Sequence, residues 1–105
     1  MNKVVLIGRL TRDVELKEGQ SGKKYANVSI AINRTTDGTD YPLVKVFGSQ
    51  AENLAKYSGK GEMVAVEGHI QTSSFNKDGE TKYVTDIICD RVEFLSWKKK
   101  ESEGQ

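Results

Sequence analysis

The amino-acid sequence predicts an all-β domain, a small barrel of five strands interrupted by one short helix. Short segments rich in β-branched residues alternate between apolar and polar positions, as half-buried strands do. Only one segment has helical spacing, and glycines stand at the expected bends. A chain of 105 residues suits one domain and is too short for two independent cores.

Three strands are expected before the helix. Residues 3–10 form a short β-branched run, and residues 11–23 have the composition of an exposed loop or a short strand extension followed by a turn. Residues 25–33 alternate strictly and are the clearest strand. After a polar loop at residues 35–40, residues 41–47 alternate again. The residues expected to face the core from these last two strands are Ala26, Val28, Ile30, Ile32, Val44 and Val46.

A short helix follows the third strand. The segment from Ser49 to Glu52 has the pattern of a capping box, in which the two side chains bind free backbone N–H groups at the start of a helix. Gly59 and Gly61 are expected to end the helix. The residues on its apolar face are Ala51, Leu54 and Ala55.

Two strands joined by a long hairpin complete the domain. Residues 63–72 have strand spacing, with Gly68 marking a bulge or tight bend, and the final strand is expected at residues 83–95. Between them, Asp78 and Gly79 are a strong signal for a hairpin turn. The residues predicted to point inward from the first of these strands are Val64, Val66 and Ile70.

This order of elements is that of the OB-fold, a five-stranded Greek-key barrel with a helix between strands three and four, whose surfaces bind oligonucleotides or oligosaccharides. We expect the barrel domain over residues 1–97. Residues 98–105 are expected to form a polar C-terminal tail, because they include no core-forming residues.

The composition excludes several classes of protein. The longest uncharged apolar run, from Val4 to Ile7, is far too short for a membrane span, and no secretory signal opens the chain, so a cytoplasmic location is expected. One cysteine and one histidine can form neither an internal disulfide nor a zinc cage, and no metal or other cofactor is expected. The 16 basic and 15 acidic residues nearly cancel and the pI is about 7.8, so binding to nucleic acid requires a local basic patch.

Four segments resemble bacterial and phage single-stranded DNA-binding proteins, in the right order and spacing. They are residues 2–13 (NKVVLIGRLTRD), 31–34 (AINR), 46–55 (VFGSQAENLA) and 60–72 (KGEMVAVEGHIQT), and the match runs in register from residue 2 to about residue 96. The resemblance implies an OB-fold protomer without enzyme activity, usually assembled as a homotetramer, although a dimer is also considered. It implies sequence-independent binding and protection of single-stranded DNA in replication, recombination and repair, in the bacterial cytoplasm or nucleoid or, for a phage protein, in the host cytoplasm.

In this family aromatic side chains stack on bases, and the matching positions here are Tyr41, Phe47 and Phe75. A fourth family aromatic falls near Thr36, where this chain lacks one. The family commonly has an acidic C-terminal tip that recruits partner enzymes, whereas this chain ends in Lys-Lys-Lys-Glu-Ser-Glu-Gly-Gln. We therefore expect a short form, either a viral-type member or a shortened chain, that does not recruit replication and repair proteins through such a tip.

The residues themselves indicate the same chemistry. Tyr41, Lys45 and Phe47 lie on the outer face of one predicted strand, where aromatic rings can stack on successive bases without reading their sequence. The alternatives are a second core layer or a subunit interface for the two rings and, for Phe75, a clamp that packs the hairpin on the barrel. The expected phosphate contacts are Lys3, Arg9, Arg12, Arg34, Lys45, Lys77 and Lys82.

The other reactive residues indicate no catalytic site. His69 is expected on the outward face of its strand as a hydrogen-bond partner, and Cys89 as a small, half-buried apolar residue. The acidic pairs considered for a nuclease, and rejected because they lie in a loop and along a strand, are Asp37 with Asp40 and Asp86 with Asp90. The remaining alternative is a protein-interaction adaptor on the same barrel, similar to the small dimeric primosomal replication proteins, with weak DNA binding.

Overall fold

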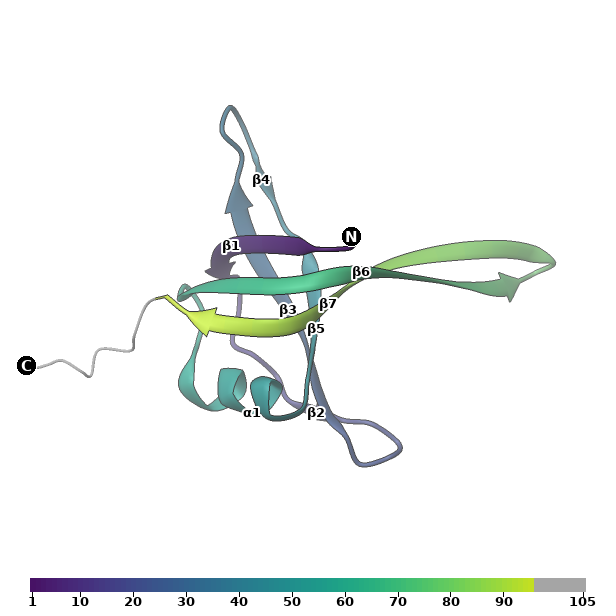
Figure 1. Cartoon of the computed structure of the whole chain (residues 1–105), viewed down its shortest axis with the longest axis horizontal. Helices are drawn as coiled ribbons and strands as arrows, with labels where there is room; N and C mark the ends of the chain where they lie inside the picture. Colours follow the sequence, from purple (N-terminus) through teal and green to yellow (C-terminus); the bar gives the residue numbers. More distant parts are fainter. Residues whose placement is uncertain (96–105) are drawn as a thin grey trace, which may run out of the picture.

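Five strands close into a ring in the computed structural model, which describes residues 1–95 (Figure 1). The ring runs β1–β6–β7–β5–β3, and β3 returns to β1 through the pairs Arg9 with Ala31 and Leu10 with Ile30. All neighbours in the ring are antiparallel except β5 and β7, which are parallel. These strands are β1 (Val4–Leu10), β3 (Lys24–Asn33), β5 (Leu43–Phe47), β6 (Met63–Lys77) and β7 (Glu80–Phe94). The predicted OB-fold is therefore confirmed.

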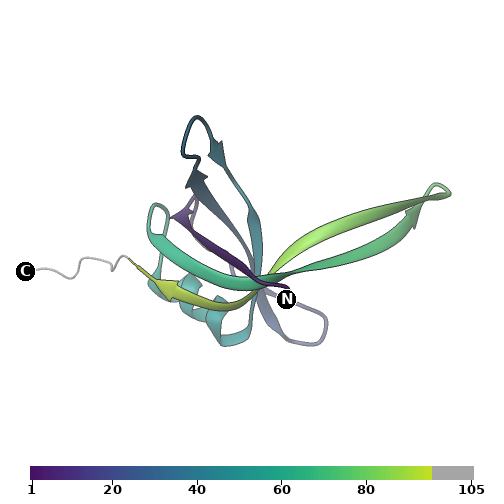
Figure 2. The same ribbon diagram turned by 45° about the horizontal axis from the view of Figure 1, so that its top comes forward.

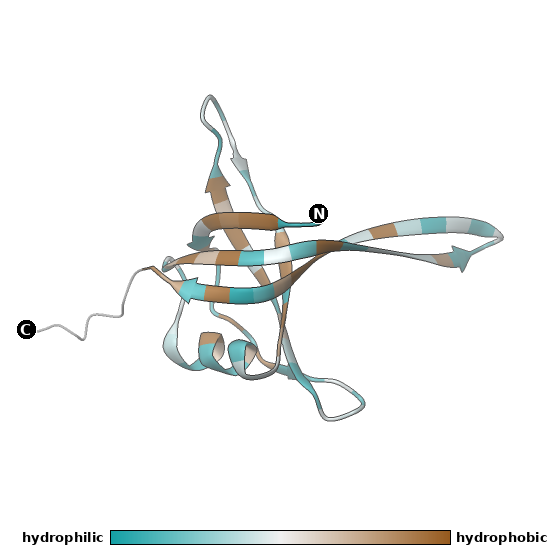
Figure 3. Ribbon diagram, in the orientation of Figure 1, coloured by the Kyte–Doolittle hydropathy of each residue, from teal (hydrophilic) through white to brown (hydrophobic). Residues whose placement is uncertain are grey.

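The core lies inside this ring and consists of alternate strand residues together with two residues of the helix. Figure 3 shows how apolar and polar residues follow one another along the strands. The pattern predicted for residues 25–47 is confirmed, with Ile32 partly buried at the margin. Alternation places one face of each strand inward and leaves the other face outside. The buried apolar residues are Leu10, Ala26, Val28, Ile30, Val44, Val46, Ala51, Leu54, Val64, Val66 and Cys89.

The helix α1 (Gly48–Tyr57) lies between β5 and β6 as predicted, but its ends differ from the prediction. Gly48, at φ +67°, turns the chain directly from β5 into the helix, and no side chain caps the first turn. Ser49 therefore lies inside the first turn, and the capping box with Glu52 does not form. At the other end, the helix ends before the glycines because Ser58 has an extended backbone (φ −131°, ψ 164°). Its Oγ and its backbone N–H both donate to the carbonyl oxygen of Leu54, at 2.6 and 3.1 Å.

The hairpin of β6 and β7 extends far beyond the barrel, and we call its outer part, residues 71–86, the arm (Figures 1 and 2). Asp78 and Gly79, both with positive φ, form the predicted turn at its tip. The inward prediction for Ile70 is wrong. Ile70 continues the apolar face of β6, but β6 leaves the barrel there, so no core covers its side chain and it is exposed.

Gly68 lies at the predicted bulge, where Glu67 pairs with Arg91 but Gly68 pairs with Cys89, so that Asp90 is the extra residue. A Cβ atom at Gly68 would overlap the backbone carbonyl oxygen of Ile88. The close approach of β6 and β7 at this point therefore requires glycine.

Two short strands flank the barrel. β2 (Lys17–Glu18) pairs with β3 and is the strand extension expected within residues 11–23. β4 (Thr39–Asp40) also pairs with β3 and lies in the segment that was predicted to be a loop. The expected domain boundary at residue 97 and the tail at residues 98–105 lie outside the described residues. Within the described range, no helix has the length and apolar character needed to cross a membrane.

Candidate nucleic-acid interface

The outer face of β5 and its neighbours carries the predicted aromatic residues. Phe47 is 44% exposed, and Tyr41, which lies just before β5, is 65% exposed, while Val44 and Val46 between them are buried. The alternative of a second core layer is therefore wrong for both rings. We call the exterior side of β3 and β5 the platform; its residues are Tyr25, Asn27, Ser29, Leu43, Lys45 and Phe47.

Phe47 has an aromatic neighbour that the sequence did not suggest. Tyr25 is its direct partner on β3, with the ring centroids 6.5 Å apart and the ring planes tilted by 37°. Sequence alternation already placed Tyr25 opposite to the core residues Ala26 and Val28. Its position beside Phe47 depends on the register between two strands, which periodicity alone does not specify.

The third predicted aromatic, Phe75, lies on the arm. It is 49% exposed and stands directly opposite Lys82, so the alternative of a clamp packed on the barrel is wrong. Lys82 in turn forms an ion pair with Glu80 at 3.1 Å. Tyr83, which pairs with Ser74 on the other side of the arm, is 80% exposed and was not predicted.

The platform leads toward the arm. Because β5 and β7 are parallel and Val44 pairs with Ile87, the residues before Val44 lie alongside the part of β7 that enters the arm. Tyr41, which precedes β5, therefore lies next to the arm end of the platform, and Phe47 is at the end near α1. Every second side chain of β6 and β7 points to the outside of the barrel. When this alternation is followed into the arm, Phe75 lies on the same, outer face.

Most of the predicted cations near these rings are already paired with carboxylates. Lys45 lies 3.4 Å from Asp86, and Arg34 forms a bidentate pair with Asp40, with Nη2 donating to Oδ1 at 2.7 Å and Nε to Oδ2 at 3.2 Å. The hydrogen bonds from Arg34 lower the pKa of Asp40 and raise that of Arg34 itself. Both groups remain ionised at neutral pH, so a phosphate must compete with Asp40 for this guanidinium.

The other predicted phosphate contacts are scattered. Lys3 lies just before β1 and pairs with Glu67 at 3.1 Å, while Arg9 lies on β1 and donates to the carbonyl oxygen of Gly61 at 3.0 Å. Arg12 follows β1 on an exposed segment, and Lys77 is exposed near the arm tip. The structure brings Lys45 together with Phe47, and Lys82 with Phe75, but it does not bring Lys3 and Arg9 onto the platform.

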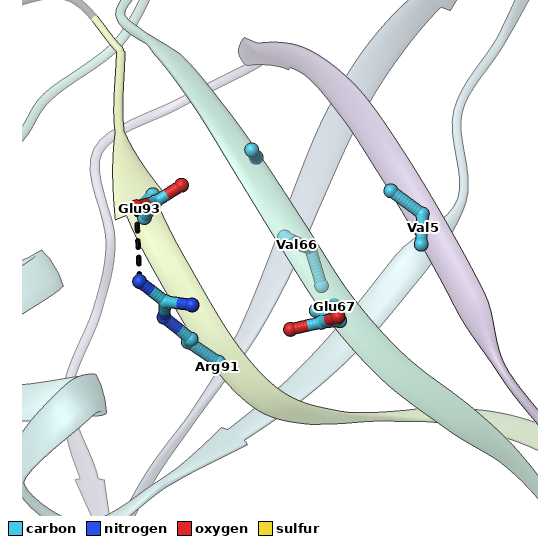
Figure 4. Close-up of a pocket in the computed structure, with 6 residues that line it drawn as sticks. Val5, Val66, Glu67, Arg91 and Glu93 are labelled. Carbon is cyan, nitrogen blue, oxygen red and sulfur yellow. Dashed lines mark hydrogen bonds and ion pairs between the residues drawn. The ribbon is translucent and has the colours of Figure 1, made fainter.

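A second surface lies outside β1, β6 and β7. It contains a shallow depression next to the exposed side chains of β1 (Figure 4). Arg91 and Glu93 form an ion pair across its margin at 3.0 Å. The residues that line the depression are Val5, Ala65, Val66, Glu67, Arg91 and Glu93.

The remaining reactive residues have structural partners. His69 Nδ1 lies 3.0 Å from the carboxylate of Asp90, as expected for a hydrogen-bonded residue on the outward face. Cys89 is buried, and burial raises the pKa of its thiol to about 11, so the thiol is protonated at neutral pH. Among residues 1–95, no group of three or more histidine, cysteine, aspartate or glutamate side chains could hold a metal ion.

Comparison with known proteins decides the family. The profile of the "Single-strand binding protein family" matches residues 1–95, which is the whole barrel together with the arm. The chain belongs to this family. The matched residues thus include the platform and the second surface, which lies outside β1, β6 and β7.

Individual members of the family are similar over nearly the full chain. A single-stranded DNA-binding protein of Clostridium tetani is 44% identical over 99% of this chain and 77% of its own length. Single-stranded DNA-binding protein 1 of Staphylococcus aureus (strain MSSA476) is 39% identical over 100% of this chain and 72% of its own length. Single-stranded DNA-binding protein 3 of Clostridium acetobutylicum is 44% identical over 92% of this chain and 72% of its own length.

Proposed function

We propose that this protein binds and protects single-stranded DNA without sequence preference and without catalysing a reaction. Membership of the single-strand binding protein family supports this function. The observation that carries it is the exposure of three rings, Tyr41 just before β5, Phe47 on the outer face of β5 and Phe75 on the arm. Exposed apolar surface that is rimmed by polar residues marks interaction sites, and every base offers a π-face for stacking.

Stacking supplies the sequence-tolerant part of the affinity, and cations supply the rest. Lys45 and Lys82 stand beside the rings, and in the proposed complex their ammonium groups turn from Asp86 and Glu80 to DNA phosphates. Arg34, Lys77 and Arg12 are assigned the same role. Lys3 and Arg9 remain proposed contacts on a separate path over β1. Since carboxylates neutralise most of these cations in the free protein, the net electrostatic gain is modest.

A titration of the full chain with poly(dT) tests the function, followed through the fluorescence of Trp97 and the tyrosines. We expect affinity to fall with salt with a slope of about −0.7 per neutralised phosphate, and stacking to leave affinity that salt does not remove. Duplex DNA of equal length should bind much more weakly, because its bases are not free to stack. Equal affinity for both forms would contradict the proposal, and weak binding to both with tight binding to a replication protein would favour the adaptor alternative.

Assembly into a homotetramer, or at least a dimer, is the second part of the proposal. Residues 4–8 of β1 have a strand neighbour, β6, along one edge only. Their other edge has no strand partner within residues 1–95, because β1 pairs with β3 only at Arg9 and Leu10. The same strand presents the exposed side chains of Val5 and Ile7 beside the depression of Figure 4. A free strand edge next to apolar side chains suits closure by a second copy related by a two-fold axis.

Light scattering on the purified chain measures this assembly. We expect a mass of about four times the protomer's 11.7 kDa at micromolar concentration, and a lower mass for Ile7→Glu, which buries a charge in the proposed interface. Glu52→Lys, an exposed change on α1, is the control and should keep the mass of the unmodified chain. A mass near 11.7 kDa for the unmodified chain would refute this part of the proposal.

Single strands occur during replication, recombination and repair, so the proposed function belongs to those processes. We place it in the bacterial cytoplasm or nucleoid, or in the host cytoplasm for a phage protein. A fluorescent fusion that fails to gather on DNA after damage in cells would contradict this placement.

A further inference from the structure

Three side chains form one row across the edge of the barrel. Lys17 on β2 pairs with Tyr25 on β3, and Tyr25 pairs with Phe47 on β5. Directly paired residues of antiparallel strands share a face, so all three side chains lie on the exterior side. Neighbouring strands are about 4.8 Å apart, so the row spans about 10 Å from the backbone of Lys17 to that of Phe47.

The two rings of this row leave aromatic surface free. At a centroid distance of 6.5 Å and a tilt of 37°, the rings of Tyr25 and Phe47 are not stacked face to face, and Tyr25 is half-buried while Phe47 is exposed. A Cβ atom at Gly19 would lie 3.9 Å from Cε1 of Tyr25, so the glycine places no side chain against the ring at this point. The pair is therefore wider than one ring and open toward β2.

Lys17, at the end of the row, differs from the nearby Lys24 in having no carboxylate partner among residues 1–95. Within residues 1–95 the ammonium group of Lys17 forms no ion pair, and the side chain is exposed. Lys24, in the next row of the same strand pair and on the opposite face, is bound to Glu18 at 3.2 Å. Lys17 can thus meet a phosphate without breaking an existing ion pair, unlike Lys45 and Arg34.

We propose that Lys17 and Tyr25 form a further nucleotide subsite that extends the platform over β2. The base rests on the Tyr25–Phe47 pair, and the phosphate on its outer side contacts Lys17. The DNA path then leaves the barrel at β2, at the opposite end of the platform from the arm. This inference rests on the proposed binding of single-stranded DNA and adds one nucleotide to its path.

The aromatic half of the subsite is tested with Tyr25→Leu and Tyr25→Phe in titrations with a dT oligomer. We expect Tyr25→Leu, which keeps apolar volume but removes the ring, to weaken binding about 5- to 10-fold, and Tyr25→Phe to bind as the unmodified chain does. Both variants should retain the melting temperature and mass of the unmodified chain. Normal binding by a folded Tyr25→Leu would overturn the subsite.

The charged half is tested with Lys17→Gln against the matched control Lys24→Gln. Each variant loses one positive charge from the same strand pair, but only Lys17 lies on the proposed path. We expect Lys17→Gln to reduce the magnitude of the salt slope by about 0.7, and Lys24→Gln to leave it unchanged. Equal slopes for the two variants would overturn the phosphate contact of Lys17. If the unmodified chain fails to bind the oligomer, the proposed function itself fails, and that outcome is distinct from both of these.

Discussion

Phe47→Ala is expected to lower the affinity for single-stranded DNA by about 1 to 3 kcal/mol while the protein stays folded. The ring is 44% exposed on the platform, so its removal takes away stacking surface without opening a cavity in the core. The buried neighbour Val46 points to the other side of β5 and keeps its packing. The measurement is a poly(dT) titration at fixed salt, together with a thermal melt of the same sample.

Two further variants, at Tyr41 just before β5 and at Lys45 on β5, separate stacking from charge. Tyr41→Phe keeps the ring and should cost much less than Phe47→Ala. Lys45→Ala should act mainly on the salt dependence, reducing the slope by roughly one phosphate equivalent, and it also releases Asp86 from its ion pair. If Phe47→Ala unfolds the chain and the residual folded fraction binds normally, Phe47 is a structural residue and its proposed role is wrong.

Gly68→Ala is expected to destabilise the barrel by about 3 kcal/mol or more. The added Cβ would overlap the carbonyl oxygen of Ile88, which belongs to the backbone of β7 and cannot move as a flexible side chain could. Relief requires β6 and β7 to separate at the bulge, next to the buried residues Val66 and Cys89. Denaturant unfolding followed by circular dichroism measures the change.

Gly19→Ala is the matched control for this prediction. A Cβ at Gly19 would meet its nearest atoms at 3.7 and 3.9 Å, which is ordinary contact, so the free energy of unfolding should change by less than about 0.5 kcal/mol. Equal stability of the Gly68 and Gly19 variants would show that the bulge can widen and that the close approach of the strands is not required.

The strand and helix content was predictable because each element has its own periodicity. Alternation in residues 25–33 and 41–47 identified which side chains enter the core, and Asp78-Gly79 identified the hairpin turn. The outward position of Tyr41 and Phe47 followed from the same alternation. The order of the elements then sufficed for the OB-fold, because few topologies close five short strands around one core.

Only the tertiary structure decides where a strand leaves the barrel and which exposed side chains become neighbours. Ile70 fits the inward pattern of β6, yet it is exposed because β6 continues beyond the barrel. Alternation with a period of two residues does not indicate where a strand leaves the core. The Ser49 capping box does not form because the helix begins at Gly48 with Phe47 as its N-cap, two residues earlier than the box predicts. The pairing of Tyr25 with Phe47, and of Lys17 with Tyr25, depends on the register between strands far apart in sequence. Local patterns determine which side of a strand faces water, whereas long-range pairing determines which exposed side chains become neighbours.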